Sequence, residues 1–315
     1  MSGDTGLTDI FQVQFTTLLR LKLQQQESKL RGKVMEGSHA GAKMASPVQF
    51  LGPTAMKTPQ GRFAPKVYDE QDYSRRWVMP VDKENDQLVD NFDQLKTPID
   101  PKSQLVARVA AAANRAFDDA IITAATATAT IGTDSGSLST EPWDTTDFQI
   151  AGNFGASAAV GLTVAKLNEA RRILEHYHAL DDDKQITLVI GSQQHADLRN
   201  QALVTSSDFN SNGGVLVNGE VTKYMGMDVV VSERLQTITD KNSAANQRSC
   251  LAFVKMGLYL GIWQDIKTEI LRRGDLSSNP WDINTMISFG ATRLELGRVI
   301  QICAADTVGN DVTAP

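Results

Sequence analysis

The feature that most constrains the fold is an alanine-rich helical pattern across residues 100–127. Asp100 can accept hydrogen bonds from the first free backbone N–H groups, and Pro101 has the fixed φ that the first helical position tolerates. Apolar residues then recur with the spacing of one helix face, at Val106, Val109, Ala113, Phe117, Ala120, Ile121 and Ala124. Such a helix is about 40 Å long. Its narrow apolar face favours a structural spine over a catalytic element; the alternative is an ordinary amphipathic core helix.

The composition is that of a globular protein. The chain has 315 residues, of which 41% are hydrophobic and 22% charged. It contains no apolar run long enough to cross a bilayer and no signal-peptide pattern, so we expect a cytoplasmic product without membrane contact. Cys250 and Cys303 lie in apolar contexts without a CxxC partner, which predicts two buried free thiols.

Charge is unevenly distributed along the chain. Residues 20–66 contain nine Lys or Arg and two Glu, a balance of +7. Because the net charge of the whole chain is −6, the remaining residues together carry −13. A basic arm on an acidic body could face nucleic acid or dock on acidic faces of neighbouring copies. The arm lacks the clustered Arg and interleaved aromatic residues of a sequence reader, which argues against sequence-specific DNA binding.

The residue pattern of the first 66 positions is not that of a compact domain. Apart from an amphipathic piece at 10–30, they are rich in Gly, Ser, Lys and Pro and cannot enclose a core. An ordered arm of this kind must borrow contacts from the body or from another subunit. Removal of residues 1–58 is therefore expected to leave a soluble protein that no longer assembles.

A hairpin is predicted after the arm. Strand-like pieces at 76–81 and 87–92 flank a polar turn at 82–86. A two-stranded hairpin is marginal alone, so we expect it to lie against another element or another copy. Arg75, Arg76 and Trp77 are the predicted intersubunit contact, because Arg and Trp are common interface anchors. The alternative is an edge strand whose ring lies on its own domain.

The remaining pattern predicts an α+β fold. A second helix starts at Thr163 and ends at 181–183, a short apolar strand covers 186–190, and Ser192 is placed to cap a helix at 196–203. Six further strand-like pieces follow, at 227–231, 250–254, 258–263, 266–271, 284–291 and 298–303. Late strands outnumber late helices, unlike a regular βαβ alternation.

Motifs for chemistry are absent from the sequence. It has no Walker loop, no GxSxG, and no GxGxxG after a strand. His176 and His178 are two apart, whereas histidines that bind zinc from a helix are four apart, so we expect a solvated helix end and no metal. We expect no cofactor and no catalytic residues. An α+β enzyme that uses the Gly-rich stretch 132–161 as a lid is the remaining enzyme alternative.

Several stretches, taken in order, resemble the major capsid proteins of tailed double-stranded DNA bacteriophages, which have the Hong Kong 97-type shell fold. The late pieces are GMDVVVS at 226–232, AFVKMGL at 252–258, IKTEI at 266–270, DINTMISFGATR at 282–293 and VIQI at 299–302. The early pieces are VD at 89–90, DP at 100–101 and ANRAFDDAII at 113–122. The resemblance covers about residues 60–306.

The resemblance implies an α+β, Hong Kong 97-type capsid fold with named parts. These are an N-terminal arm (1–58), an extended β-hairpin loop (59–96), a peripheral domain with the spine helix (97–182 and 264–306), an axial domain (183–263) and a C-terminal tail (307–315). The axial domains of several copies would meet at five-fold and six-fold axes.

The same resemblance implies a function and partners. Copies would form hexamers and pentamers of an icosahedral virion shell, assembled in the host bacterial cytoplasm around double-stranded DNA that is contacted without base reading. Expected partners are a separate scaffolding protein, a portal protein and a decoration protein. The alternative within the same fold is an encapsulin-like nanocompartment shell, which would enclose a cargo enzyme.

Overall fold

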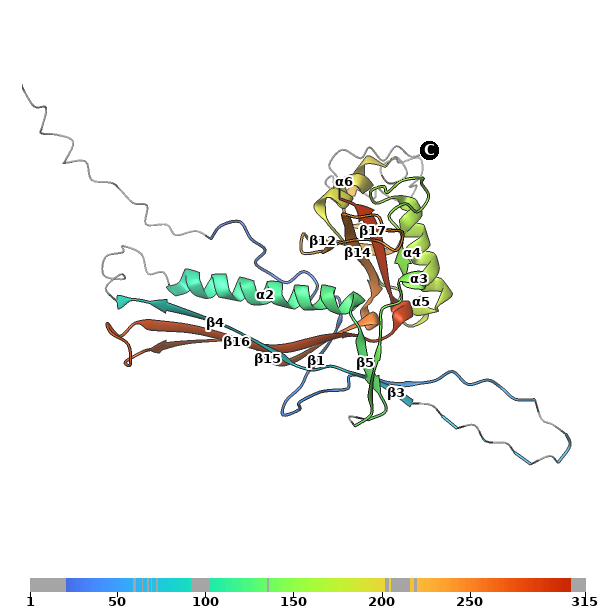
Figure 1. Ribbon diagram of the computed structural model, residues 1–315, viewed down its shortest axis with the longest axis horizontal. Coiled ribbons are helices and arrows are strands. Elements are labelled where there is room, and N and C mark those ends of the chain that lie inside the picture. Colours follow the sequence, from blue (N-terminus) through green and yellow to red (C-terminus); the bar gives the residue numbers. More distant parts are fainter. Residues whose placement is uncertain are drawn as a thin grey trace, which may run out of the picture.

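The molecule is an elongated limb with an upright lobe at one end (Figure 1). The computed structural model describes residues 21–58, 61–63, 65–66, 68, 70–71, 73–91, 102–134, 136–201, 204, 216–217 and 220–306. We call the long helix with its four-stranded sheet the limb, and the seven-stranded sheet with its helices the lobe. The predicted tail at 307–315 and the first 20 residues lie outside the described residues.

Helix α2 (Lys102–Thr126) is the predicted spine, and it lies along the sheet of the limb (Figure 1). Its alanine stripe lets the strands approach closely, while Phe117 supplies the bulk. The ring centroids of Phe117 and Phe289 lie 4.7 Å apart, and both side chains are buried. The predicted cap at Asp100 and Pro101 lies outside the described residues.

The sheet of the limb has the order β1-β15-β16-β4. Its strands are β1 (Met35–Ser38), β4 (Val81–Val89), β15 (Leu258–Arg272) and β16 (Trp281–Arg293). β15 and β16 form a long antiparallel hairpin with bulges near Gln264, and β1 joins β15 in parallel. On β16 the residues facing α2 are buried and alternate with half-buried ones, the pattern of a strand with one covered face.

The predicted hairpin at 76–92 is wrong. Residues 82–86, expected to turn, lie in the middle of β4, which pairs with Trp281–Phe289 of β16 along its whole length. The partner strand is nearly 200 residues away, so local pattern carries no sign of it. Polar residues are tolerated in mid-strand because one face of β4 points to solvent.

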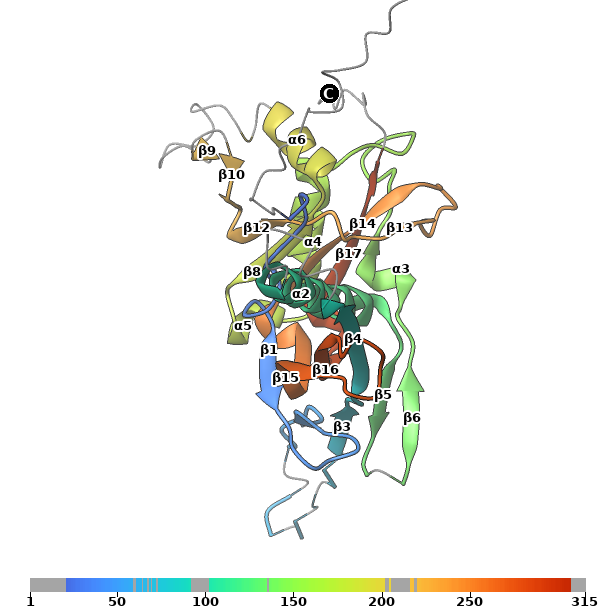
Figure 2. The same ribbon diagram turned by 90° about the vertical axis from the view of Figure 1, so that its left-hand side faces the viewer.

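The lobe is built on a seven-stranded mixed sheet (Figure 2). Its order is β11 (Lys223–Tyr224), β12 (Met227–Val231), β8 (Ile186–Ile190), β14 (Gln247–Val254), β17 (Val299–Ala305) and β7 (Gln149–Ile150), with β13 (Thr237–Ile238) beside β14. The helices of the lobe are α3 (Thr145–Phe148), α4 (Val164–His176), α5 (Ala179–Asp182) and α6 (Ser192–Asn200). All residues of β8 and β17 are buried, which makes this sheet the centre of the main core.

The local predictions for the lobe mostly hold. The Thr163 side chain caps α4 as expected, accepting from the Lys166 N–H. The helix ends earlier than predicted, because His178 adopts a left-handed φ of 56° before the short α5. The predicted cap at Ser192 is wrong: Gly191 is the N-cap and Ser192 already belongs to α6. The Ser192 N–H instead donates to Glu233.

The sequence-based division at residue 263 does not match the two bodies. The expected division places β17 in the peripheral domain (264–306), separate from the axial domain (183–263). In the structure β17 lies in the same sheet as β8 and β14, which belong to the expected axial domain. β15 crosses the expected boundary as one strand of the limb. Sheets join strands that are distant in sequence, so a division into contiguous segments cannot reproduce them.

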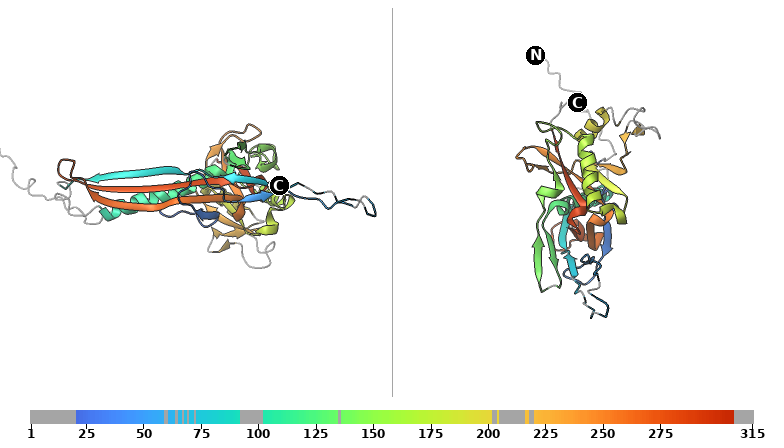
Figure 3. Two further views of the ribbon diagram at one scale, coloured as in Figure 1. Left: turned by 90° about the horizontal axis from the view of Figure 1, so that it is seen from below. Right: turned by 90° about the vertical axis from the view of Figure 1, so that its right-hand side faces the viewer.

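A third, smaller sheet carries a projecting segment. It has the order β2 (Gln49–Leu51), β3 (Tyr73–Trp77), β5 (Ala129–Gly132) and β6 (Leu138–Glu141). Between β2 and β3 the chain runs out from the body and back, pointing away from the tip of the limb (Figures 1 and 3). We call the described residues of 52–71 the projection; the extension therefore lies earlier than the predicted 59–96.

Four minor elements complete the described chain. β9 (Leu216–Val217) pairs with β10 (Glu220–Val221), and single 3-10 turns, η2 (Lys255–Gly257) and η3 (Leu296–Arg298), lead into β15 and β17. Both cysteines are buried free thiols, as predicted. Within the described residues, no helix is long and apolar enough to cross a membrane.

Candidate assembly surfaces

The residues before β1 are held on the chain's own body by a buried carboxylate. Asp118, in the middle of α2, is fully buried. It accepts hydrogen bonds from the Gln25 and Ser28 side chains and from the backbone N–H groups of Lys29 and Leu30, the last two at 3.0 and 3.2 Å. We call residues 24–38 the strap. This segment has no regular secondary structure here, so its backbone N–H groups need other acceptors, and the Asp118 carboxylate supplies them. Asp118 therefore anchors the strap.

The strap continues into the core and corrects the prediction of a separate arm at 1–58. The Leu30 and Val34 side chains are 0% and 1% exposed and belong to the main core cluster. The two terminal nitrogens of Arg31, Nη1 and Nη2, donate to the Asp265 carboxylate of β15 at 3.0 and 2.7 Å. The Arg31 guanidinium also lies over the Phe117 ring. Deleting residues 1–58 would therefore open the core of the subunit, and the assembly expectation has to be tested with a shorter deletion.

The limb and the lobe are joined by polar contacts. Arg234, just after β12, forms a bidentate ion pair with Asp119 of α2. The Lys29 ammonium of the strap donates to the Val231 carbonyl oxygen at 2.7 Å. α2 thus has the sheet of the limb on one side, and the strap and the end of β12 on the other.

The three predicted contact residues lie on β3 but differ in exposure. Arg76 is 8% exposed, pairs with Glu141 at 2.8 Å, and donates to the Leu294 carbonyl. Trp77 is half-buried, and its Nε1 donates to the Gly132 carbonyl at 3.3 Å. Arg75 is half-buried as well. Arg76 is therefore engaged within its own chain, and an intersubunit role for the three stays a prediction.

The projection exposes apolar side chains on a basic segment. The most exposed are Leu51 at its base and Met56, Phe63 and Tyr68 along it, at 62%, 101%, 95% and 86%. Residues 51–66 contain three basic residues and no acidic one. Large apolar side chains grouped on one exposed segment mark an interaction surface.

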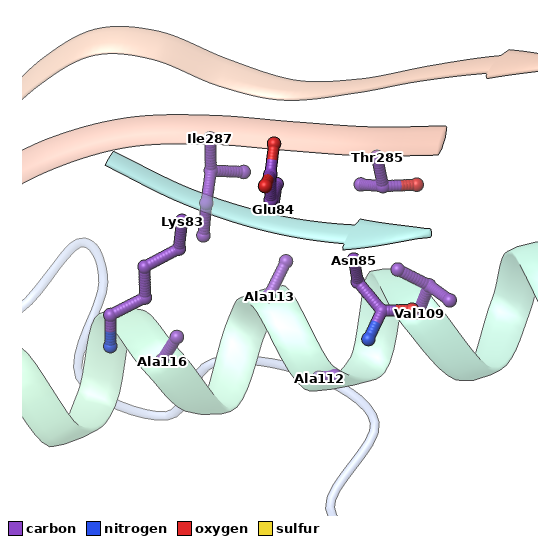
Figure 4. A pocket seen from close by; sticks show the side chains of 9 residues that line it. All are labelled: Lys83, Glu84, Asn85, Val109, Ala112, Ala113, Ala116, Thr285 and Ile287. Atoms are coloured by element: carbon purple, nitrogen blue, oxygen red, sulfur yellow. The ribbon is translucent and has the colours of Figure 1, made fainter. Parts of the chain in front are cut away.

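The limb offers a surface of opposite charge. Asp82, Glu84 and Asp86 alternate along β4 and are exposed. They share one face of the strand, and Glu84 points away from α2 (Figure 4). In the described part of the chain, β4 pairs on one side only, with β16, so its other edge is an open strand edge.

The lobe contains a buried lysine that sequence reasoning missed. Lys166 of α4 is fully buried, and its ammonium donates to the carbonyl oxygens of Gly152, Val160, Gly161 and Cys303 at 2.8, 2.8, 3.0 and 2.9 Å. Burial lowers the pKa of Lys166 to about 8. These four carbonyls come from the loop before α4 and from β17, so the lysine has a structural role. A single lysine on an amphipathic helix gave no signal of burial.

A catalytic or metal-binding arrangement is not found among the described residues. They contain no group of three or more His, Cys, Asp or Glu that could hold a metal ion. Burial raises the pKa of Asp197, whose carboxylate accepts from the Leu162 N–H at 3.1 Å. Asp197 thus binds the same loop before α4 whose carbonyl groups Lys166 binds.

The fold is that of capsid subunits. The structure is similar to the capsid of the cyanophage P-SCSP1u, with a TM-score of 0.69 and 17% identity over 96% of this chain and 95% of that chain. It is similar to the cyanophage Pam1 capsid, with a TM-score of 0.70 and 11% identity over 97% and 99% of the two chains. It also resembles the capsid of a native GTA particle, with a TM-score of 0.62 and 15% identity over 95% and 96%.

The sequence supports the same class independently of the fold. The family model described as phage capsid protein matches residues 7–305. This chain therefore belongs to the phage capsid protein family, and it is a shell protein of the virion with a structural role. No curated protein matches the sequence. The comparisons give no support to the nanocompartment alternative.

Proposed function

We propose that copies of this chain assemble into pentamers and hexamers of a closed icosahedral shell around double-stranded DNA. The observation that carries this proposal is the projection, whose Met56 and Phe63 side chains are exposed and not covered by the described part of the chain. A segment with no core of its own is stabilised when a neighbouring copy covers it. Many such contacts of modest size sum to a stable closed assembly.

The parts of the shell subunit are proposed as follows. The part of the lobe at 183–263 is the axial region that meets its copies around five-fold and six-fold axes. The limb and the third sheet, with Arg75 and Trp77 on β3, form contacts away from those axes. The projection reaches neighbouring subunits, because it extends beyond the two bodies (Figure 3). Residues 1–20 are proposed to do the same.

The proposed partners follow from charge and from the shell itself. DNA is contacted without base reading, through basic residues of the segment 20–66. A separate scaffolding protein directs curvature, a portal protein occupies one vertex, and a decoration protein binds outside. Assembly takes place in the cytoplasm of the host bacterium.

The test is electron microscopy with mass measurement on the protein expressed alone and with a candidate scaffolding protein. Closed shells or tubes of uniform curvature are the expected result. A small oligomer that stays small in both preparations would contradict self-assembly. Deletion of residues 1–20 replaces the deletion of residues 1–58 as the test of the N-terminal segment, because it spares the strap and the buried Leu30. Subunits so shortened should fold but assemble poorly; normal shells would remove this segment from the account.

A further inference from the structure

A pocket opens between α2 and the strands that it covers (Figure 4). Its volume is about 160 Å³, and its floor is formed by Val109, Ala113 and Ala116 of α2 and by Ile287 of β16. Lys83 and Asn85 of β4 point from the strand toward the helix at its rim (Figure 4). The pocket exists because three successive positions of the helix face are alanine or valine, which are too short to fill the space to the strands.

The size and lining of the pocket match one aromatic side chain. An apolar cavity of about 150 Å³ in another protein binds benzene. A phenyl ring therefore fits this space, whereas an indole ring is larger. The occupant has to come from outside the helix and its sheet, because their own side chains leave the pocket open.

The projection presents such a ring. Phe63 is 95% exposed and has a φ of 72°, in the left-handed region that a bulky residue rarely adopts. The Arg62 guanidinium lies over its ring at 5.7 Å. Strained backbone that holds an aromatic side chain out in solvent is typical of a contact site that a partner completes.

We propose that Phe63 of one copy inserts into the α2–β4 pocket of a neighbouring copy, an inference that rests on the proposed shell function. The neighbour has to be a second copy because the projection points away from the limb of its own chain (Figures 1 and 3). Charge at the open edge of β4 is mixed: Lys83 points toward the pocket, whereas Asp82, Glu84 and Asp86 are exposed on the opposite face of the strand (Figure 4). In the docked arrangement the basic Arg62 and Lys66 beside the ring pair with these carboxylates around the strand edge.

The direct test is a disulfide between the two partners. Phe63→Cys and Ala116→Cys are combined in one chain, and assembled shells are oxidised and run on a denaturing gel. The native thiols do not interfere, because burial raises the pKa of Cys250 and of Cys303 to about 12 and keeps them protonated. We expect a ladder of covalent oligomers from the double variant and single bands from each single variant.

A matched pair controls for general proximity. Leu51→Cys with Ala116→Cys uses another exposed apolar residue, at the base of the projection. It should give no ladder. An equal ladder from this control, or intact shells of the Phe63→Cys/Ala116→Cys variant without a ladder, overturns the proposed insertion. The shell function would still stand in that case, whereas failure of the unmodified chain to form shells would refute the function itself.

A second measurement avoids introduced cysteines. Ala116→Leu fills the pocket from the helix, and Phe63→Ala removes the ring; each should raise the subunit concentration needed for half-assembly about tenfold. The double variant should be no worse than either single one, because both remove the same contact. Ala107→Leu, on an exposed position of the same helix, is the control. Equal assembly of all variants contradicts the proposal.

Discussion

The lobe and the limb bury their side chains in different ways. In the lobe, every residue of β8 and β17 is buried on both faces. In the limb, β4 exposes seven of its nine residues, and β16 buries only the face under α2. The lobe therefore completes its core within one chain. In the described part of the chain, the limb and the projection leave surfaces exposed, and we propose that other copies cover them.

The difference extends to polar groups. In the lobe, Lys166 and Asp197 are buried, and most of their hydrogen bonds are made with backbone groups of the loop before α4. In the limb, charged groups such as Lys267 and Glu269 pair at the surface. Loss of a buried group leaves its partners unsatisfied, whereas surface pairs exchange with water. The predictions below test this contrast from the largest expected effect to the smallest.

The largest effect is expected for Lys166→Ala in the lobe. The substitution removes the ammonium donor from four carbonyl oxygens, of which those of Gly152 and Val160 keep a backbone donor, and it removes a fully buried side chain. We expect a loss of about 3–5 kcal/mol in the free energy of unfolding. Denaturant unfolding of unassembled subunits measures it. Lys267→Ala in the limb should change the same quantity by less than about 0.5 kcal/mol. Similar losses in both variants would refute the contrast.

The next effect concerns the strap, because its contact with α2 is a place where the limb buries a charged group, Asp118, as the lobe does. Asp118→Ala removes the acceptor of two side chains and two backbone N–H groups. We expect a loss of about 2–4 kcal/mol, because the buried N–H group of Leu30 and the partly buried N–H group of Lys29 lose their acceptor. Tryptic cleavage at Lys29 and Arg31 should accelerate in parallel.

Asp119→Ala is the control for the strap because it is the neighbouring carboxylate on α2, paired at the surface with Arg234. Its effect should stay below about 1 kcal/mol, with cleavage of the strap unchanged. Equal cleavage of the two variants would mean that the strap is held by Leu30 and Val34 alone.

How much of this could be predicted from sequence depends on the range of the interaction. α2 and β8 were predicted because their periodicity and end signals are local. The turn expected at 82–86 became mid-strand because β4 finds its partner near residue 285. Propensity cannot indicate a pairing at that distance.

The candidate surfaces show the same limit. The sequence identified a basic, poorly packed segment before residue 66, and the projection lies in it. Arg76 looked like an interface anchor, but it pairs internally with Glu141, on a strand 65 residues further along. The pocket beside Ala113 and Ala116 depends on what α2 lies against, so the alanine stripe alone could not reveal it.

A pH measurement sharpens the comparison from within the core of the lobe. Burial raises the pKa of Cys250 to about 12, against about 9 in the unfolded chain. Between these values the unfolded state has released the proton and the folded state has not, so stability falls as pH rises. Cys250→Ala should make this slope less negative by about 1.4 kcal/mol per pH unit.

Unfolding at pH 8, 9, 10 and 11 measures the slope of each protein. Burial of Lys166 acts in the opposite direction, because its pKa is lowered to about 8 and stability recovers as pH rises above that value. The pKa of Lys166 is lowered mainly by burial, which is common to both proteins, so most of that contribution cancels in their difference. Parallel slopes would mean that the thiol is accessible to solvent, contrary to a core completed within the chain.

The smallest effect is expected where limb and lobe meet at the surface. Arg234 and Asp119 form a bidentate pair whose side chains are 35% and 40% exposed. The carboxylate raises the pKa of Arg234, but solvent screens a pair this exposed, so its coupling energy should lie below about 1 kcal/mol. A double-mutant cycle with Arg234→Gln and Asp119→Asn measures it, and 1 M salt should reduce it further. A coupling above about 2 kcal/mol that resists salt would show that this junction behaves like the interior of the lobe. The limb would then be fixed to the lobe by charge as well as by the strap and by the hydrophobic core that the two bodies share.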